Sequence, residues 1–222
     1  MSKEKAGKTK GLFIVVSAPS GAGKTSIIRE VLKICPNMLF SVSYTTRPPR
    51  PGEEDGKDYC FVTEEAFRER IAQEEFAEWE EYSGYLYGTS AKTMKAFLEK
   101  GFDLILDVEP RGAGTLKKHY PGGIFVFILP PSMDELKKRL DGRGFDNEEE
   151  MKERLDRALE EMREVAWYDY VIFNDRLESA TDQLRSIYVA EKNRRERVAE
   201  KIEEFLCVKQ EEVLTAYGKN YC

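Results

Sequence analysis

The residues of this sequence best suited to phosphate chemistry lie in one glycine-rich stretch near the N-terminus. The stretch consists of Ala18, Pro19, Ser20, Gly21, Ala22, Gly23, Lys24 and Thr25. The backbone N–H groups of such a loop, together with the N-terminus of a following helix, can surround a phosphate group. In this pattern Lys24 bridges the β- and γ-phosphates of ATP, and the Thr25 hydroxyl is a ligand of Mg²⁺. The stretch therefore predicts ATP binding.

The match to the phosphate-loop pattern G-x-x-x-x-G-K-[ST] has one departure, because Ala18 stands where the first glycine is usual. A turn that is merely rich in glycine is the alternative. The apolar residues 12–16 before the loop predict a strand, and apolar residues at helical spacing follow it. This context favours phosphate binding, but a phosphate loop alone does not distinguish GTPases, motor ATPases and small-molecule kinases.

Two further groups of charged residues extend the predicted chemistry. Arg47 and Arg50 lie three residues apart on a proline-rich loop, and guanidinium forks suit phosphate oxygens. Asp107 and Glu109 follow the apolar residues 104–106, and alternate residues at a strand end face the same way. Asp107 is expected to organise Mg²⁺ through a water molecule. For Glu109, an acid without a direct role is the alternative.

Apolar runs at residues 12–16, 104–106, 124–129 and 170–173 alternate with helical patterns. They predict an α/β protein, a three-layer fold around a central parallel sheet, whose ligands bind at the carboxyl ends of the strands. Two stretches interrupt the alternation, and we expect an inserted lobe and a helical lid there. The expected division is a core of residues 11–42, 90–131 and 159–193, a lobe of residues 43–89, a lid of residues 132–158, and a C-terminal helix and tail of residues 194–222.

Several local patterns refine this division. Ser132 and Glu135 form a capping box that predicts a helix start. From about Ser179 to Leu206 the chain shows one long helical pattern that contains a cluster of arginines. A solvated helix face is the expected role of that cluster.

Composition excludes several classes of protein. The net charge of −6 argues against a general nucleic-acid binder, and the charged fraction of 34% argues against a membrane protein. The presence of a single histidine argues against a Ser-His-Asp hydrolase and against a metal site built from several histidines. Four scattered cysteines fit free thiols in a reducing cytoplasm.

At this point the motifs resemble those of guanylate kinases, over roughly residues 11–192. The shared segments, in order, are S-x-S-x-T-T-R-x-P-R-x-G-E, G-K-D-Y, F-x-E-W, Y-G-T, L-D-V-E, I-L-P-P-S and G-R-G. The resemblance implies a phosphate-loop core, an inserted lobe that binds a nucleoside monophosphate, and a lid.

The resemblance also implies which residues bind GMP. The acceptor phosphate is held by residues that match Arg47, Arg50, Tyr59 and Tyr87, and the guanine is read by residues that match Glu78, Ser43, Thr89 and Asp107. Guanine presents N1–H and N2–H₂ as adjacent donors that one carboxylate can accept, whereas adenine does not. Glu109 completes this set, although the family usually carries aspartate there. The alternatives are a solvated carboxylate for Glu78 and core packing for the two tyrosines.

Lid and adenine contacts are implied in the same way. Lid arginines that close over the transferring phosphoryl group match Arg139, Arg143 and Arg154, and Arg157 is a weaker match. Surface ion pairs with neighbouring glutamates are the alternative for these arginines. Asn174 matches an asparagine that contacts the adenine of ATP. Lys24 and Arg47 are expected to take part in catalysis together with Arg139, Arg143 and Arg154.

The sequence as a whole predicts an enzyme that moves the γ-phosphoryl group of ATP, with Mg²⁺, to GMP and also to dGMP. No nucleic acid or membrane partner is expected, and a homo-oligomer is compatible with the sequence. Two alternatives stay open, a non-catalytic binding module of guanylate-kinase shape and a kinase of another phosphorylated acceptor. Lys24, Thr25, Arg47 and Arg50 favour the enzyme, and Glu78 favours guanine.

Overall fold

The central element of the protein is a parallel sheet of five strands. The computed structural model describes residues 10–141 and 148–206. The strand order is β2-β7-β1-β8-β9, and every neighbouring pair is parallel. The strands are β1 (Phe13–Ser17), β2 (Met38–Phe40), β7 (Asp103–Asp107), β8 (Ile124–Leu129) and β9 (Tyr170–Phe173). The α/β class and the parallel sheet predicted from the apolar runs are confirmed. Within this sheet, β2 is the one strand that no apolar run predicted.

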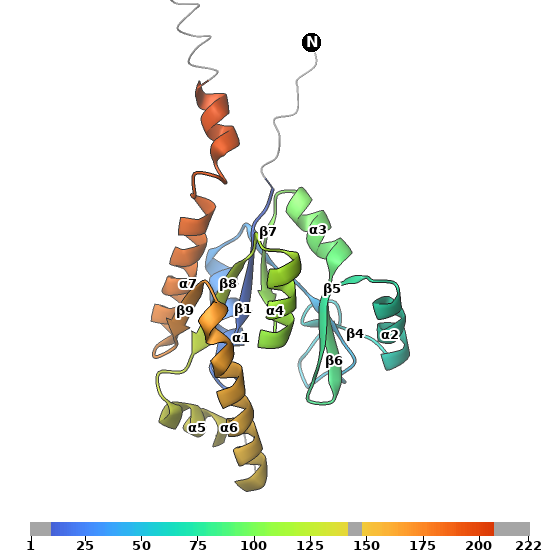
Figure 1. The fold of residues 1–222 in the computed structure, drawn as a ribbon. Helices are drawn as coiled ribbons and strands as arrows, with labels where there is room; N and C mark the ends of the chain where they lie inside the picture. The colour runs from blue at the N-terminus through green and yellow to red at the C-terminus, as the bar shows by residue number, and fades with distance from the viewer. Residues whose placement is uncertain (1–9, 142–147, 207–222) are drawn as a thin grey trace, which may run out of the picture.

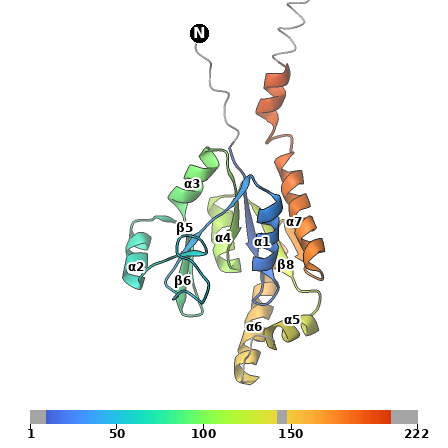
Figure 2. The ribbon, with the colours of Figure 1, turned by 180° about the vertical axis from the view of Figure 1, so that it is seen from behind.

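Helices cover both faces of this sheet, which gives three layers (Figures 1 and 2). On one face α1 (Lys24–Ile34) and α7 (Leu177–Lys192) pack against alternate strand residues such as Ile14 and Val126. On the other face α3 (Ala91–Glu99) and α4 (Pro110–His119) pack against the intervening strand residues, such as Val15 and Phe127. Because both faces are buried, the strands consist of continuous apolar residues and do not alternate with polar ones.

A second, smaller sheet lies beside the first, on the right in Figure 1. Its order is β4-β3-β6-β5. It consists of β3 (Ser43–Thr45), β4 (Tyr59–Phe61), β5 (Phe76–Tyr82) and β6 (Tyr85–Ser90), with α2 (Glu64–Ala72) between β4 and β5. We call this sheet with α2 and the loop of residues 46–58 the acceptor lobe.

Two helices, α5 (Met133–Asp141) and α6 (Glu148–Arg163), lie below the carboxyl ends of the central strands in Figure 1. Ser132 Oγ accepts a hydrogen bond of 3.1 Å from the N–H of Glu135, which confirms the predicted helix start. Leu136 and Leu140 of α5 pack against Ala158 of α6. A short 3₁₀ turn, η1 (Glu164–Trp167), joins α6 to β9. Arg143 lies outside the described residues.

The single long helix predicted from Ser179 to Leu206 is wrong. Helix α7 ends at Lys192, residues 193–198 form a turn, and residues 199–206 are helical again. The Asn193 side chain donates a hydrogen bond of 2.7 Å to the Val189 carbonyl. Asparagine is favoured at helix ends, because its short side chain can bond to nearby backbone groups.

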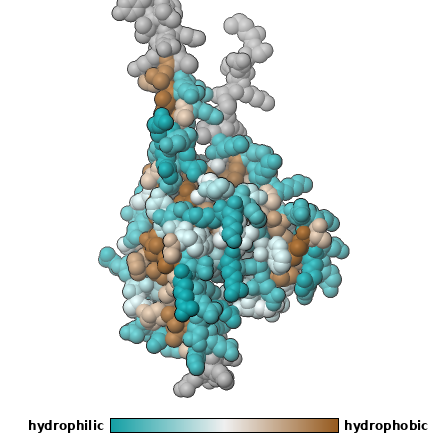
Figure 3. Space-filling model, viewed as in Figure 1, coloured by the Kyte–Doolittle hydropathy of each residue, from teal (hydrophilic) through white to brown (hydrophobic). Residues whose placement is uncertain are grey.

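The described surface is largely polar. Ile202, Phe205 and Leu206 are exposed hydrophobic residues of the last helical turns, and Figure 3 shows that hydrophilic residues otherwise cover most of this face. Among residues 10–141 and 148–206, none of the helices has both the length and the apolar content needed to cross a bilayer.

Candidate active site

The phosphate loop connects the end of β1 to the start of α1. Gly21 and Gly23 have φ angles of 87° and 95°, in the left-handed region that other residues rarely adopt. A Cβ atom at Gly23 would also lie 2.4 Å from Asn174 Nδ2. Ala18 is buried, and its φ angle is not positive. The absence of a glycine at position 18 is therefore compatible with this backbone, whereas the other two glycines are required.

Lys24, the first residue of α1, lies between two carboxylates. Its Nζ is 2.7 Å from Asp107 Oδ1 and 3.2 Å from Glu109 Oε1. Burial alone would lower the pKa of Lys24, but Asp107 and Glu109 raise it well above its ordinary value. Burial raises the pKa of Glu109, and Lys24 acts against that shift. The two acids at the end of β7 thus face the phosphate loop, as their spacing predicted.

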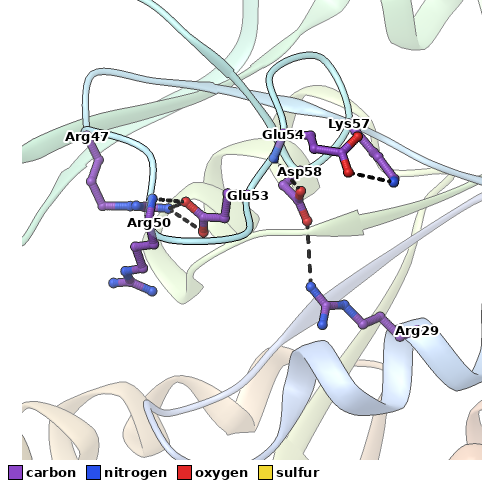
Figure 4. Close-up of polar contacts among 7 residues, drawn as sticks. All are labelled: Arg29, Arg47, Arg50, Glu53, Glu54, Lys57 and Asp58. Atoms are coloured by element: carbon purple, nitrogen blue, oxygen red, sulfur yellow. Dashed lines mark hydrogen bonds and ion pairs between the residues drawn. The ribbon is translucent and has the colours of Figure 1, made fainter.

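Arg47 is held by an acid that sequence reasoning had not assigned. Its guanidinium donates hydrogen bonds of 2.8 and 2.9 Å to the two oxygens of Glu53 (Figure 4). Glu53 also accepts a 2.7 Å bond from the N–H of Arg50. In Figure 4 the guanidinium of Arg50 points away from Glu53. Although burial acts to raise the pKa of Glu53, Arg47 and the Arg50 N–H lower it, so Glu53 stays ionised.

Two tyrosines lie beside this arginine. The Arg47 guanidinium carbon is 5.4 Å from the ring centre of Tyr59, and the rings of Tyr59 and Tyr87 are 6.0 Å apart. Burial raises the pKa of Tyr59 to about 12, with a further contribution from Asp107. The Tyr59 hydroxyl is therefore protonated at neutral pH, and a protonated hydroxyl can donate to a phosphate oxygen.

Glu78 is a buried carboxylate. The sequence alone left open whether this side chain is buried or solvated. Its side chain is 5% exposed, and the Thr89 hydroxyl donates a hydrogen bond of 2.5 Å to Oε1. Burial raises the pKa of Glu78 to about 7. Two residues farther along β5, Glu80 accepts a 3.0 Å bond from the N–H of Gly112, and burial raises its pKa to about 7 as well.

One cavity of about 660 Å³ brings most of these residues together. It is lined by Lys24 and Thr25 from the phosphate loop and by Asp107 and Glu109 from the sheet. From the acceptor lobe its lining includes Ser43, Arg47, Arg50, Tyr59, Glu78 and Tyr87. Thr89 lies behind Glu78 and reaches the cavity only through that carboxylate. An ion pair of 3.6 Å between Arg29 of α1 and Asp58 joins the two sides of the cavity (Figure 4).

The other predicted residues have different surroundings. Asn174 donates a 2.7 Å bond to the Ala22 carbonyl and so braces the phosphate loop. Arg139 donates to the carbonyls of Ala22 and Asn174, at 3.4 and 3.1 Å, and does not line the main cavity. Arg154 lines an adjoining cavity of about 190 Å³ together with Arg47.

Sequence reasoning missed three acids near the site, Glu53, Glu80 and Glu161. Glu53 belongs to the shared motif around the arginine pair, so its position six residues after Arg47 was a usable signal. Glu161 lies on α6, and its Oε2 accepts a 3.3 Å bond from the N–H of Ser20. Nothing local distinguishes Glu161 from the many other glutamates of that helix.

The chemistry of the oxygen donors is compatible with Mg²⁺. Within the described residues, no three His, Cys, Asp or Glu side chains are grouped so that they could hold a metal ion by themselves. Mg²⁺ in phosphoryl transfer is usually held by one or two protein oxygens, water and the nucleotide phosphates. Thr25 and Asp107 line the same cavity and could supply such oxygens.

Comparisons with known proteins agree with this geometry. The family model described as guanylate kinase matches residues 10–191. The guanylate kinase of Syntrophus aciditrophicus is 60% identical over 200 residues, which are 90% of this chain and 96% of that protein. That of Geobacter metallireducens is 48% identical over 197 residues, 89% of this chain and 97% of that protein.

A solved structure shows the same fold. The crystal structure of guanylate kinase from Anaplasma phagocytophilum superposes with a TM-score of 0.71 at 30% identity, over 88% of this chain and 97% of that one. The phosphate loop, the arginine pair and the buried glutamate thus occur in a chain that matches this family over most of its length. The chain belongs to the guanylate kinase family.

Proposed function

We propose that this protein transfers the γ-phosphoryl group of ATP to GMP, and also to dGMP, and releases ADP with the corresponding diphosphate. One observation carries the proposal. Lys24 of the phosphate loop, the pair Arg47 and Arg50, and the carboxylate of Glu78 line a single cavity. Donor and acceptor phosphates bound there would lie between the same walls, so direct transfer needs no intermediate carrier. The family makes the protein a nucleoside monophosphate kinase.

The nucleophile needs no general base from the protein. A phosphate monoester has a second pKa of about 6, so the acceptor oxygen is already ionised at neutral pH. The remaining task is to align two anions and to offset the charge that spreads over the transferring group. Lys24 and Arg47 are placed to supply that positive charge from opposite sides of the cavity. Thr25 would hold Mg²⁺ directly and Asp107 would hold it through a water molecule, and the ion would offset negative charge on the phosphates.

The acceptor lobe supplies selectivity for guanine. Glu78 is ionisable, buried and oriented by Thr89, so it can accept from both N1–H and N2–H₂ of the base. Adenine has no matching pair of donors, so the buried carboxylate would lack the two hydrogen bonds that guanine supplies, and this loss costs binding free energy. Ser43, which also lines the cavity, provides a hydroxyl that can donate to guanine O6.

We propose the domain limits and lid roles on the same grounds. Residues 43–89 form the GMP-binding lobe, and residues 132–158 form a lid whose arginines approach the transferring phosphoryl group. Arg154, beside Arg47, supports this role most directly, and the role of Arg143 stays a prediction. The cytoplasmic location also stays a prediction, supported by the free thiols of Cys35 and Cys60.

The proposed function predicts a clear order of acceptors. Purified protein with Mg-ATP should phosphorylate GMP and dGMP, while AMP, CMP and UMP should react at least about 10³-fold more slowly in kcat/KM, because a site built on hydrogen bonds rejects bases that leave it unpaired. A coupled assay of ADP release measures all five rates. Equal rates across the panel would contradict the guanine assignment, and ATP hydrolysis without any acceptor phosphorylation would contradict the kinase assignment.

The pKa of Glu78 predicts a pH dependence for GMP use. A carboxyl with a pKa of about 7 is mostly protonated at pH 6 and mostly ionised at pH 8, and only the ionised form accepts two hydrogen bonds. The KM for GMP should therefore fall about tenfold from pH 6 to pH 8. Steady-state kinetics at a series of pH values, with saturating Mg-ATP, measure the effect.

Two variants isolate this ionisation. Glu78→Gln should show a high KM that retains only the smaller pH dependence of the GMP phosphate, whose pKa is about 6. Glu80→Gln is the matched control, since the Glu80 charge helps to raise the pKa of Glu78. In Glu80→Gln the plot of the GMP KM against pH should shift to lower pH but keep its shape. Identical profiles for the wild type and Glu78→Gln would show that Glu78 does not bind the base.

A further inference from the structure

Helix α6 carries three polar residues toward the space between the acceptor lobe and the phosphate loop. Arg154, Arg157 and Glu161 are spaced by three and four residues, which places them on one face of the helix. The adjacent apolar face, which includes Ala158, packs against α5. Leu136 and Leu140 of α5 also lie against the phosphate loop, because a Cβ atom at Gly21 would be 3.1–3.2 Å from their methyl groups. The position of α6 is therefore tied to that of the loop.

Arg157 contacts the acceptor lobe at the turn between β5 and β6. Its Nη1 donates a hydrogen bond of 2.6 Å to Ser83 Oγ, and its guanidinium carbon lies 5.4 Å from the ring centre of Tyr82. Ser83 and Gly84 form a two-residue turn with φ angles of 51° and 78°. Serine is an uncommon residue in the left-handed region. Here its hydroxyl is the group that the arginine binds.

Glu161 makes the corresponding contact with the phosphate loop. Its carboxylate is 9% exposed and accepts the 3.3 Å bond from the N–H of Ser20. Tyr82 lies near the same carboxylate, and both groups line a cavity of about 300 Å³ together with Arg157. Tyr82 thus lies beside both Arg157 and Glu161. One strand end of the acceptor lobe is linked, through two residues of α6, to the loop that would hold ATP.

We propose that Arg157 and Glu161 are positioning residues that couple the acceptor lobe to the phosphate loop. When GMP fixes the lobe, Tyr82 and Ser83 hold α6, and Glu161 orders the loop at Ser20 for ATP. In the same placement Arg154 of α6 and Arg47 line one cavity of about 190 Å³. Neither positioning residue needs to touch a nucleotide. The inference rests on the proposed function, because it requires that GMP and ATP both bind.

The test is the binding of one nucleotide in the presence of the other. Isothermal titration calorimetry measures the Kd of a non-hydrolysable ATP analogue with Mg²⁺, with and without saturating GMP. In the wild type GMP should tighten the analogue about tenfold, within the usual range for coupled sites. Arg157→Ala, Ser83→Ala and Glu161→Ala should reduce this factor to about twofold or less, while each nucleotide alone binds within about threefold of the wild type. The KM for Mg-ATP at saturating GMP should rise about fivefold in these variants, because the tightening by GMP is lost.

Conservative variants separate positioning from general structural damage. Glu161→Gln keeps an oxygen that can accept from the N–H of Ser20, so it should restore the coupling that Glu161→Ala loses. Combining Arg157→Ala with Ser83→Ala should lose no more than Arg157→Ala alone, because that change already removes the contact with Ser83. The matched control is Arg163→Ala. Arg163 is exposed and lies about half a helical turn after Glu161 on α6, so this variant should behave as the wild type.

The possible results discriminate clearly. Retained coupling in both Arg157→Ala and Glu161→Ala, with unchanged melting temperatures, would overturn the proposal. Weaker binding of the analogue to Glu161→Ala without GMP would also overturn it, because Glu161 would then only support the loop. A wild type that binds and phosphorylates GMP but shows no coupling overturns the proposal alone. A wild type that does not bind GMP contradicts the proposed function itself.

Discussion

Replacing Lys24 by alanine is expected to reduce kcat/KM by about 10³-fold or more, the largest effect of any single change in this protein. Lys24 lies at the start of α1, and its Nζ is held between Asp107 and Glu109, at 2.7 and 3.2 Å. Its removal takes away the charge that would neutralise the β- and γ-phosphates, and it leaves two carboxylates that repel them. Loss of one preorganised donor in such a site costs about 10²–10³ in rate, and the repulsion adds to that cost.

Lys33→Ala is the matched control for this prediction. Lys33 lies in the last turn of the same helix, is exposed and pairs with Glu30 at 2.7 Å. Its loss should change kcat/KM by less than about twofold, as expected for a surface ion pair. The measurement is steady-state phosphorylation of GMP, with circular dichroism and melting temperature to confirm folding. A folded Lys24→Ala variant that retained more than a tenth of the activity would contradict the role of the loop.

Arg47→Ala is expected to reduce kcat/KM for GMP by about 10³-fold while the Kd of an ATP analogue changes less than about threefold. Arg47 is 8% exposed and is oriented by Glu53 through two hydrogen bonds, so its guanidinium is already ordered before an acceptor phosphate arrives. Hydrogen bonds to a charged group contribute about 1.5–3 kcal/mol each, and two such bonds account for an effect of this size. The variant also leaves Glu53 without its cation beside the phosphate.

The control for Arg47 is Arg68→Ala, on the exposed face of α2 in the same lobe. Arg68 pairs with Glu64 at 2.6 Å, and both side chains are about 60% exposed. This variant should phosphorylate GMP as the wild type does. Arg47→Lys keeps the charge but not the fork, and should recover only part of the activity. Equal losses of GMP and ATP affinity in Arg47→Ala would mean that the arginine supports the whole cavity and does not serve the acceptor specifically.

Much of the fold was predictable because it depends on short-range patterns. The four apolar runs became strands of the parallel sheet, since a strand buried on both faces has no polar alternation. The helix start at Ser132 followed from a side chain that caps a nearby N–H. The same local reasoning failed after Lys192, where apolar spacing continues but the Asn193 side chain takes a backbone acceptor. Periodicity alone does not report the local side-chain bonds that accompany the end of a helix.

The site was predictable to the extent that its motifs are contiguous. The phosphate loop and the pair Arg47 and Arg50 each occupy a few consecutive residues, so the spacing of their groups is set by the local backbone. Whether Glu78 was a solvated acid or a buried one could not be decided in this way. Its neighbours in sequence include other glutamates, and its burial depends on strand and helix packing from distant segments.

By itself, then, the sequence determined the class of fold, the phosphate loop and the types of side chain available for two anions. Only the tertiary structure decided that Lys24 lies between Asp107 and Glu109, 85 residues from the latter in the chain, and that Glu161 meets Ser20 across 141 residues. The physical reason is the range of the interactions. Turn and strand preferences act over a few residues, whereas the pairing of buried charges depends on how complete layers pack, and the raised pKa of Glu78 arises only from that packing.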